Sequence, residues 1–277
     1  MSHMEYSAWR DFIEEQSGIY FYKNQLQYLS NCVWNRMRTL GSACFSEYYR
    51  YVALNFDGKK EWKNLLELLV NNETSFFRHV PSYEALKNRI LPDIMSQKSK
   101  RGVQTITMWS AGCSTGQEPY SMAMGAMEVE SSHEWEIKVY GSDISQKAIQ
   151  KADQGVFGSH ESRRLPLFYC NKYMNPVEQY GGFFKQIKDD LKSLVNFRHI
   201  NLNEPDSYSV PYQDIIFCQN VLIYFRQEKR VEIVRQICQK LNPGGYLFLA
   251  PAEVVGLRIP GIKSVRLKNS MVYQRAD

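Results

Sequence analysis

Apolar residues in the first part of the chain recur at the spacing of an α-helix. Over residues 26–40 they follow one another at intervals of three and four, and Gly41 then provides a helix end. The same pattern returns over residues 62–69. No alternating strand pattern appears before residue 100. The pattern predicts an all-helical N-terminal domain over residues 1–75, followed by a helix and a charged linker over residues 76–102.

From residue 103 onward, short apolar runs alternate with helical stretches. This alternation predicts an α/β fold, a doubly wound and mostly parallel sheet, over residues 103–277. Residues 264–273 alternate around a turn and predict an antiparallel edge hairpin, whereas residues 155–195 fit the pattern poorly and indicate an inserted subdomain. The expected strands are 103–109, 135–140, 214–218 and 246–250, the expected helices are 118–130, 145–152 and 227–241, and residues 242–245 are expected to form a turn.

The composition of the chain excludes several classes of protein. The chain has 277 residues, 44% hydrophobic and 23% charged, which excludes disordered, collagen-like and fibrous proteins. No stretch approaches the roughly 20 apolar residues that span a bilayer, and Met1–Met4 resembles a vector-derived remnant rather than a signal peptide. The six cysteines form no C-x-x-C pair, so we expect reduced thiols, no metal site and a soluble, cytoplasmic protein. The formal charge of +5 is too small to demand nucleic acid as a partner.

A glycine turn joins the first predicted strand to the helix after it. Gly112 and Gly116 allow the backbone to approach a ligand closely, and a helix N-terminus favours anionic groups. The dinucleotide pattern G-x-G-x-x-G is absent, so a pyrophosphate cradle is not expected, and an ordinary tight turn is the alternative. Asp143 ends the next strand and can accept hydrogen bonds from ribose hydroxyls, although such an aspartate can also cap a helix. Together these features predict a nucleoside cofactor such as S-adenosylmethionine.

Polar residues follow the strand predicted at 214–218. Gln219 and Asn220 fall at its carboxyl end, where ligands bind in open α/β sheets, and Tyr224 lies on the turn that leaves the strand. Core packing explains the apolar residues of this segment but not two amides at the mouth of the sheet. We therefore expect Gln219 and Asn220 to line the cofactor crevice.

Five segments together resemble the motifs of the chemotaxis-receptor methyltransferases, the CheR family. Their order and spacing match from about residue 5 to residue 255, and the N-E-T-x-F-F-R and S-x-G-x-E-P-Y-S elements are more specific than a single glycine loop. The resemblance implies a Rossmann-like methyltransferase sheet with an inserted β-subdomain. It also implies methyl transfer from S-adenosylmethionine to glutamate side chains on the cytoplasmic helices of a chemoreceptor. The segments are Asn72–Arg78, Ala111–Ser121, Ser142–Ile144, Asn201–Leu202 and Asn220–Phe225.

The resemblance also implies roles for individual residues. Arg78 and Tyr224 would be the catalytic residues, beside the departing methyl group, while Glu118 would bind the methionine amino end and Asp143 the ribose. A glutamate side chain is ionised at pH 7, so the nucleophile needs no general base, in keeping with the lack of an obvious histidine or cysteine dyad. The residues expected to bind the cofactor are Asn72, Thr74, Arg78, Gly112, Glu118, Asp143, Asn201, Leu202, Gln219 and Asn220.

The sequence departs from the family pattern at two positions. Family members commonly carry arginine where this chain has Gln219, and a His-Ser-Glu segment where it has Pro251–Glu253. These departures leave open a signalling protein that binds S-adenosylmethionine without turnover. A second alternative is a methyltransferase on the same scaffold that acts on nucleic acid or a small molecule. The second lacks the Asn/Asp-Pro-Pro-Tyr element typical of base-amine enzymes.

A basic stretch suggests where an acidic partner could dock. No acidic residue occurs between Glu15 and Glu47, whereas Lys23, Arg36 and Arg38 lie in this interval. Complementary charge speeds encounter and sets register, so the stretch is suited to an acidic receptor helix, with a merely solvated helix face as the alternative. We expect a monomer that binds no nucleic acid and does not insert into a membrane.

Overall fold

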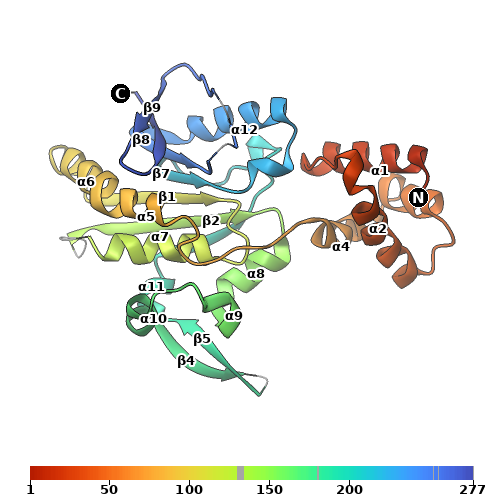
Figure 1. The fold of residues 1–277 in the computed structure, drawn as a ribbon, viewed down its shortest axis with the longest axis horizontal. Helices are drawn as coiled ribbons and strands as arrows, with labels where there is room; N and C mark the ends of the chain where they lie inside the picture. Colours follow the sequence, from red (N-terminus) through yellow and green to blue (C-terminus); the bar gives the residue numbers. More distant parts are fainter. Residues whose placement is uncertain (130–133, 180, 252, 255, 277) are drawn as a thin grey trace. The chain divides into compact units, whose positions relative to one another are not determined.

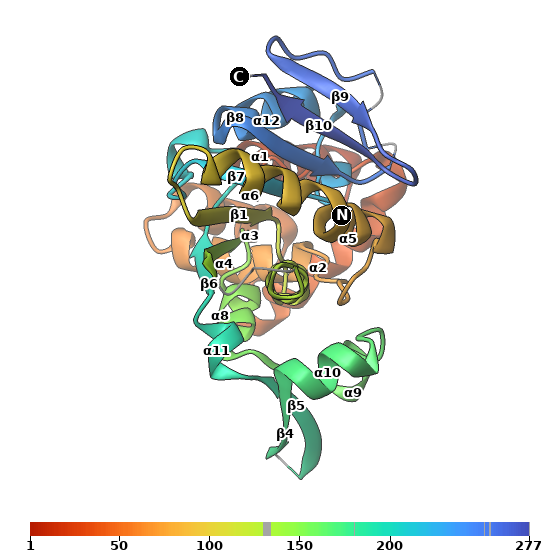
Figure 2. The same ribbon diagram turned by 90° about the vertical axis from the view of Figure 1, so that its left-hand side faces the viewer.

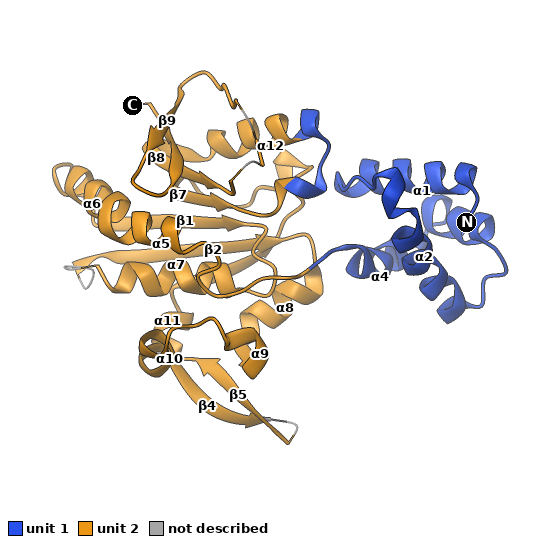
Figure 3. Ribbon diagram, viewed as in Figure 1, with its two compact units in different colours: residues 1–71, 223–229 blue, residues 72–222, 230–277 orange. Residues whose placement is uncertain are grey.

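A computed structural model describes residues 1–129, 134–179, 181–251, 253–254 and 256–276. The chain divides into two compact units (Figure 3). Unit 1 comprises Met1–Asn71 together with Ile223–Lys229, and unit 2 comprises Asn72–Leu222 together with Arg230–Asp277. Among the helices of the described residues, none combines the length and apolar character that a membrane span requires.

Unit 1 is built from amphipathic helices. The apolar spacing predicted on the second of them is confirmed, since Leu29, Val33 and Met37 are buried and the helix ends at Gly41, which has a φ of 71°. Ser2 forms a capping box with Glu5, so the first residues take part in the first helix. The elements are α1 (His3–Ser17), η1 (Lys23–Gln25), α2 (Leu26–Leu40), α3 (Phe45–Leu54) and α4 (Gly58–Leu69).

A buried ion pair joins three helices of unit 1. Glu61 on α4 is only 4% exposed, and Arg36 on α2 donates to both of its oxygens, from Nε and Nη2, at 2.7 Å each. The Tyr48 hydroxyl of α3 donates to the same carboxylate at 2.7 Å. Burial alone would raise the pKa of Glu61, but the hydrogen bonds from Arg36, Tyr48 and Asn64 hold this pKa below its usual value. Arg36 is therefore part of the internal structure of unit 1.

Unit 2 contains a seven-stranded sheet in the order β6-β2-β1-β7-β8-β10-β9 (Figure 1). The first five strands are parallel, and β10 pairs antiparallel with both β8 and β9, which confirms the predicted doubly wound sheet and its edge hairpin. The strands are β1 (Thr105–Ala111), β2 (Glu136–Asp143), β6 (Val195–His199), β7 (Gln213–Cys218), β8 (Leu241–Leu249), β9 (Ile262–Arg266) and β10 (Met271–Arg275).

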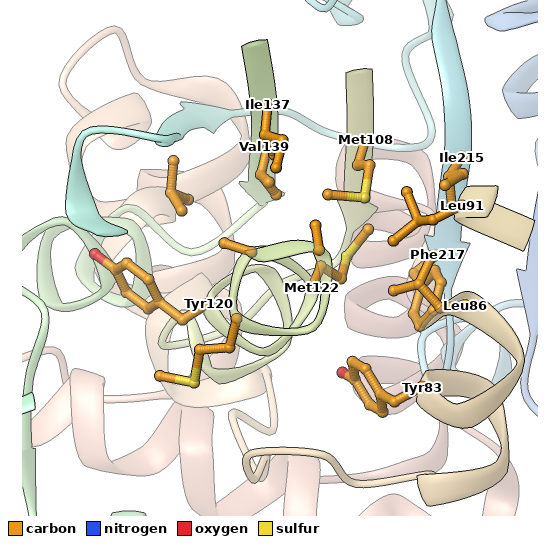
Figure 4. Packing of buried hydrophobic residues seen from close by; sticks show 14 of the residues in the cluster. Tyr83, Leu86, Leu91, Met108, Tyr120, Met122, Ile137, Val139, Ile215 and Phe217 are labelled. Carbon is orange, nitrogen blue, oxygen red and sulfur yellow. The ribbon is translucent and has the colours of Figure 1, made fainter. Parts of the chain in front are cut away.

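Apolar side chains fill both faces of this sheet. On one face, Met108 and Phe217 pack with Tyr83 and Leu86 from the helices that precede β1 and with Met122 from the helix that follows it (Figure 4). Their strand neighbours, such as Trp109 and Ile216, are also fully buried on the opposite face, as expected for parallel strands covered on both sides. The helices are α5 (Val80–Ala85), η2 (Leu86–Ile90, a π-helix), α6 (Leu91–Ser99), α7 (Gln117–Met127), α8 (Gln146–Gln154), η5 (Leu222–Tyr224) and α12 (Gln227–Gln239).

The insertion predicted at 155–195 contains a small antiparallel sheet with the strand order β3-β5-β4. Figures 1 and 2 show β4 and β5 of this sheet at the lower end of unit 2, with the short helices α9 and α10 packed near them. The elements are β3 (Val156–Gly158), α9 (Ser159–Ser162), α10 (Leu167–Tyr173), β4 (Met174–Gln179), β5 (Gly182–Ile187) and α11 (Asp189–Lys192), and the chain continues after β6 with η4 (Pro205–Ser207).

The turn predicted at 242–245 is wrong. These residues belong to β8, which begins at Leu241 and pairs with Gln213 through an irregular register. Gly245 lies so close to β7 that a Cβ atom there would stand 3.0 Å from the Asp214 carbonyl oxygen. The Pro-Gly-Gly sequence thus accommodates a bulged, closely approaching strand. Of the helix predicted at 118–130, Glu130 lies outside the described residues.

Candidate functional site

The candidate site lies at the carboxyl ends of three adjacent parallel strands. β1 pairs with β2 on one side and with β7 on the other, so the direction of winding reverses at β1. Ligands of open α/β sheets bind in the crevice at such a switch point. Gly112, Asp143 and Gln219 directly follow or end these three strands, as the sequence predicted.

The turn after β1 requires glycine at both predicted positions. Gly112 has a φ of 88°, and a Cβ atom there would lie 2.2 Å from Cγ2 of Val221. Gly116 has a φ of 96°, and a Cβ atom there would lie 2.8 Å from Cβ of Ala152. Both residues therefore combine a left-handed backbone with a close approach that a side chain would block.

Ser114 connects this turn to two other predicted segments. Its amide donates to Oδ2 of Asp143 at 2.8 Å, and its hydroxyl donates to the carbonyl of Asn72 at 2.8 Å. Oδ1 of Asp143 accepts from the Ser145 amide at 2.9 Å. Ser114 has a φ of 50°, an uncommon conformation for a non-glycine residue that often marks a functional site. Asn72, the glycine turn and Asp143 are thus held together at one edge of the sheet.

The Asn72–Arg78 segment is fixed at its other end as well. Phe77 has a φ of 49°, and its amide donates to the Ser121 hydroxyl of α7 at 3.1 Å. Phe76 is fully buried, and Nη1 of Arg78 donates to the Glu73 carbonyl at 3.1 Å. The guanidinium of Arg78 therefore stands on a segment whose backbone is anchored on both sides.

Glu118 lies in the first turn of α7, where its Oε1 accepts from the Ser110 hydroxyl at 2.7 Å. Burial and the negative charge of Glu253 raise the pKa of Glu118, whereas the hydrogen bond from Ser110 and the positive charge of Arg78 lower it, and the resulting pKa is about 7. Glu118, Glu253 and Arg78 are therefore close enough to influence one another. A carboxyl group in this state is suited to binding a cation.

Gln219 is held by partners that the sequence analysis missed. Its Nε2 donates to the Ser82 hydroxyl at 2.9 Å and to the Leu249 carbonyl at 3.4 Å, and the Ser82 hydroxyl also bonds Nδ1 of His79 at 2.8 Å. Ser82 is 2% exposed, and burial lowers the pKa of His79. Because the Leu249 carbonyl can only accept, the nitrogen end of the Gln219 amide is directed to that side. No sequence pattern distinguishes Ser82 from other serines at a helix start.

A cleft of about 380 Å³ opens beside these residues within unit 2. Three parts of the chain line it: the segment that begins at Asn72, the start of α7, and α9 with the residues after it. Its lining residues are Asn72, Glu73, Thr74, Ser75, Arg78, Thr115, Gln117, His160, Glu161, Arg163 and Arg164. Within the described ranges, no group of three or more histidine, cysteine, aspartate or glutamate side chains could hold a metal ion.

Comparison with known proteins identifies the family. The family described as "CheR methyltransferase, SAM binding domain" matches residues 72–266, and the family described as "CheR methyltransferase, all-alpha domain" matches residues 4–70. The chain belongs to the CheR methyltransferase family. The chemotaxis protein methyltransferase 2 of Vibrio cholerae is 32% identical, with 98% of this chain and 92% of that protein covered. The chemotaxis protein methyltransferase of Escherichia coli is 30% identical, with 87% of this chain and 81% of that protein covered.

Membership of the CheR family confirms the predicted class of enzyme and its cofactor. The protein is an S-adenosylmethionine-dependent methyltransferase of the chemotaxis type. The matched SAM-binding domain includes Asn72, Asp143 and Gln219, so the residues gathered at the strand ends lie within it. The individual roles predicted for these residues remain predictions.

Four of the predicted site residues take no part in the contacts described above around Ser114, Glu118 and Gln219. Asn201 makes local contacts, since Nδ2 donates to Glu204 at 2.8 Å and Oδ1 accepts from the Asn203 amide at 3.0 Å, and Leu202 is buried. Asn220 has a φ of 61° on the turn after β7. Tyr224 belongs to unit 1, where its carbonyl accepts from the Tyr20 amide at 2.8 Å. Because Arg78 belongs to unit 2, the catalytic role of Tyr224 beside it remains a prediction.

Proposed function

We propose that the protein methylates glutamate side chains on the cytoplasmic helices of a chemoreceptor, acting as a monomer in the cytoplasm. The observation that carries the proposal is the Ser114 junction, which unites Asn72, the glycine turn and Asp143 beside Arg78 and Glu118. The names of the two relatives given above, both chemotaxis protein methyltransferases, support the chemoreceptor as substrate.

The donor set at the crevice fits S-adenosylmethionine. That cofactor carries a sulfonium and an ammonium, and the carboxylates of Glu118 and Glu253 supply the opposite charge at the methionine end. Asp143 ends β2, and in this proposal it accepts from the ribose hydroxyls in addition to the Ser114 and Ser145 amides. Gly112 permits the close packing against Val221 that shapes the turn after β1. In this proposal the remaining cofactor contacts come from Asn72, Thr74, Arg78, Asn201, Leu202, Gln219 and Asn220.

Positioning of the acceptor carboxylate accounts for the reaction. S-adenosylmethionine, when bound, supplies an electrophilic methyl group on a good leaving group. The side chain of the acceptor glutamate, whose pKa in an open peptide is about 4.3, is ionised at neutral pH and needs no general base. Arg78 orients this carboxylate for in-line attack, and Tyr224 helps to align the methyl group. Arg78 must hold the acceptor only loosely, because a tight ground-state complex would slow the attack.

Transfer of radiolabelled methyl from S-adenosylmethionine to purified receptor fragments tests the proposal. We expect base-labile label in the receptor, which is the property of a methyl ester. Cofactor binding without transfer to any receptor would indicate a non-catalytic signalling protein, and label on nucleic acid or a small molecule would indicate another substrate class. Calorimetry with S-adenosylhomocysteine checks the cofactor site separately.

The basic stretch of η1 and α2 is the proposed docking site for the receptor, but Arg36 does not contribute to it as an exposed charge. Its guanidinium is bound to Glu61, whereas Arg38 lies over the ring of Trp34 at 4.8 Å, and the Trp34 side chain is 47% exposed. Lys23 and Arg38 are therefore the residues we retain as candidates for receptor contact. Substituting Arg36 would leave the buried Glu61 carboxylate without its cation.

We predict that Arg38→Glu raises the KM for receptor roughly tenfold, because one favourable charge contact becomes a repulsive one. The melting temperature and the affinity for S-adenosylmethionine should not change. In contrast, Arg36→Glu should destabilise unit 1 by about 3 kcal/mol, measured by urea unfolding. Unchanged receptor KM in Arg38→Glu at low salt would exclude this stretch of α2 from docking.

A further inference from the structure

The wall of the cleft formed by α9 and the residues after it is basic. Arg163 and Arg164 both line the cleft and are exposed, and neither guanidinium makes a hydrogen bond or ion pair with the residues that the structure describes. His160 lines the same wall. Exposed arginines that face a cleft without an internal partner are candidates for binding an anion.

The charge of Glu161, the acidic residue that lines the cleft from α9, is already neutralised by an ion pair. Glu161 pairs with Lys151 of α8, and its Oε2 accepts from the Gly158 amide at 2.9 Å. These contacts hold α9 in place and use the charge of Glu161 internally. The cleft is left with Arg78 on one wall and Arg163 and Arg164 on the other, against Glu73 alone.

The cleft contains more arginine side chains than one acceptor carboxylate requires. One guanidinium suffices to orient one carboxylate, and Arg78 ends the segment that carries Asn72 and Thr74. The residues proposed for the cofactor lie at the strand ends and on the Asn72–Arg78 segment, whereas Arg163 and Arg164 come from the inserted subdomain. Arg163 and Arg164 are thus two further cations that line the cleft from a different part of the chain.

We propose that Arg163 and Arg164 bind a second carboxylate of the substrate, next to the glutamate that is methylated. The pair thereby selects acidic polypeptide segments, in which a target glutamate has an acidic neighbour. The inference rests on the proposed function, because it assumes a protein carboxylate as the acceptor. It assigns substrate specificity to residues of the insertion that face the N-E-T-S segment.

Steady-state kinetics of the Arg163→Gln/Arg164→Gln protein test this assignment, with a receptor fragment that the wild-type protein methylates. We expect the KM for receptor to rise about fivefold, since each lost surface contact is worth up to about 1 kcal/mol, with kcat within about twofold of wild type. The difference should shrink at about 0.5 M NaCl because salt screens exposed charges. The control Lys263→Gln/Arg266→Gln removes two exposed charges from β9, at the far edge of the sheet, and should behave as wild type.

A binding measurement makes the test independent of turnover. A hexaglutamate peptide, titrated calorimetrically into protein saturated with S-adenosylhomocysteine, should bind wild type about fivefold more tightly than the double variant, and a hexaglutamine peptide should not discriminate. Equal hexaglutamate affinity for both proteins would overturn the inference. So would weaker binding of S-adenosylmethionine by the double variant, since the arginines would then contact the cofactor. Failure of wild type to methylate any receptor would refute the proposed function, while the peptide titration would still decide this inference.

Discussion

Glu118→Gln is expected to weaken S-adenosylmethionine binding about 100-fold at pH 8 while making the cofactor-free protein more stable. The glutamine keeps an oxygen to accept from Ser110 but loses the charge that would bind the methionine ammonium. A charge-assisted hydrogen bond in a partly buried site is worth roughly 2–3 kcal/mol. Calorimetric titration of the cofactor measures the loss, and Glu178→Gln, an exposed glutamate of β4, is the matched control.

The stability effect has a defined pH dependence. The folded-state pKa of Glu118 is raised to about 7 from its ordinary value of 4.5. Ionisation of Glu118 therefore costs more free energy in the folded protein than in the unfolded chain, and it lowers the free energy of unfolding. Its contribution to stability is fully present below pH 4.5 and is lost as the pH rises through about 7. The variant should therefore gain about 2–3 kcal/mol over wild type between pH 5 and pH 8, seen as a widening difference in melting temperature. Equal melting curves at both pH values would contradict the burial of this carboxyl.

The cofactor affinity of the wild-type protein should follow the same ionisation. Below pH 7 a growing fraction of Glu118 is protonated, so affinity for S-adenosylmethionine should fall as the pH falls, and the Glu118→Gln protein should lack this dependence. The negative charge of Glu253 near Glu118 contributes to this dependence, because it raises the pKa of Glu118.

Sequence periodicity predicted the parts of the fold that depend on local pattern. The buried face of α2 and the strand ends that carry Gly112 and Asp143 follow from apolar spacing and from the general position of ligands in parallel sheets. The bulged start of β8 did not, because its Pro-Gly-Gly sequence is typical of a turn, and only the neighbouring strand explains why glycine is needed there.

Contacts between distant residues could not be predicted from one sequence. Arg36 looked like a free surface cation, but its partner Glu61 lies 25 residues away and becomes a neighbour only when α2 packs on α4. Ser82 lies in no motif and carries no periodic or charge signal, yet its hydroxyl accepts from Gln219. Ser114 lies in the S-x-G-x-E-P-Y-S element, but the motif does not reveal that its hydroxyl donates to the Asn72 carbonyl. The family motifs supplied the site residues, and the structure supplied the serine contacts that position them.

Arg78→Ala is expected to lower kcat at least about 100-fold, which is the cost of removing one oriented group at the reaction centre. The side chain is exposed and bonds only the Glu73 carbonyl among the contacts that the structure describes, so the melting temperature should change little. Arg78 also lowers the pKa of Glu118, so its removal should weaken S-adenosylmethionine binding near pH 7. At about pH 9, where Glu118 is ionised in either protein, the part of this loss that comes from Glu118 should disappear, and only the loss of the direct contact between Arg78 and the cofactor should remain.

Comparing kcat with cofactor affinity at the two pH values therefore separates the two effects of Arg78. Arg89→Ala is the matched control, because the Arg89 side chain is 69% exposed and, among the described residues, its ion pair is with Asp93 one helical turn away. The variant Arg78→Lys keeps the positive charge near Glu118 but cannot grip a carboxylate at two points, so it should restore cofactor binding near pH 7 without restoring kcat. Full turnover by Arg78→Ala at pH 9 would remove Arg78 from the reaction and leave it only an electrostatic effect on Glu118.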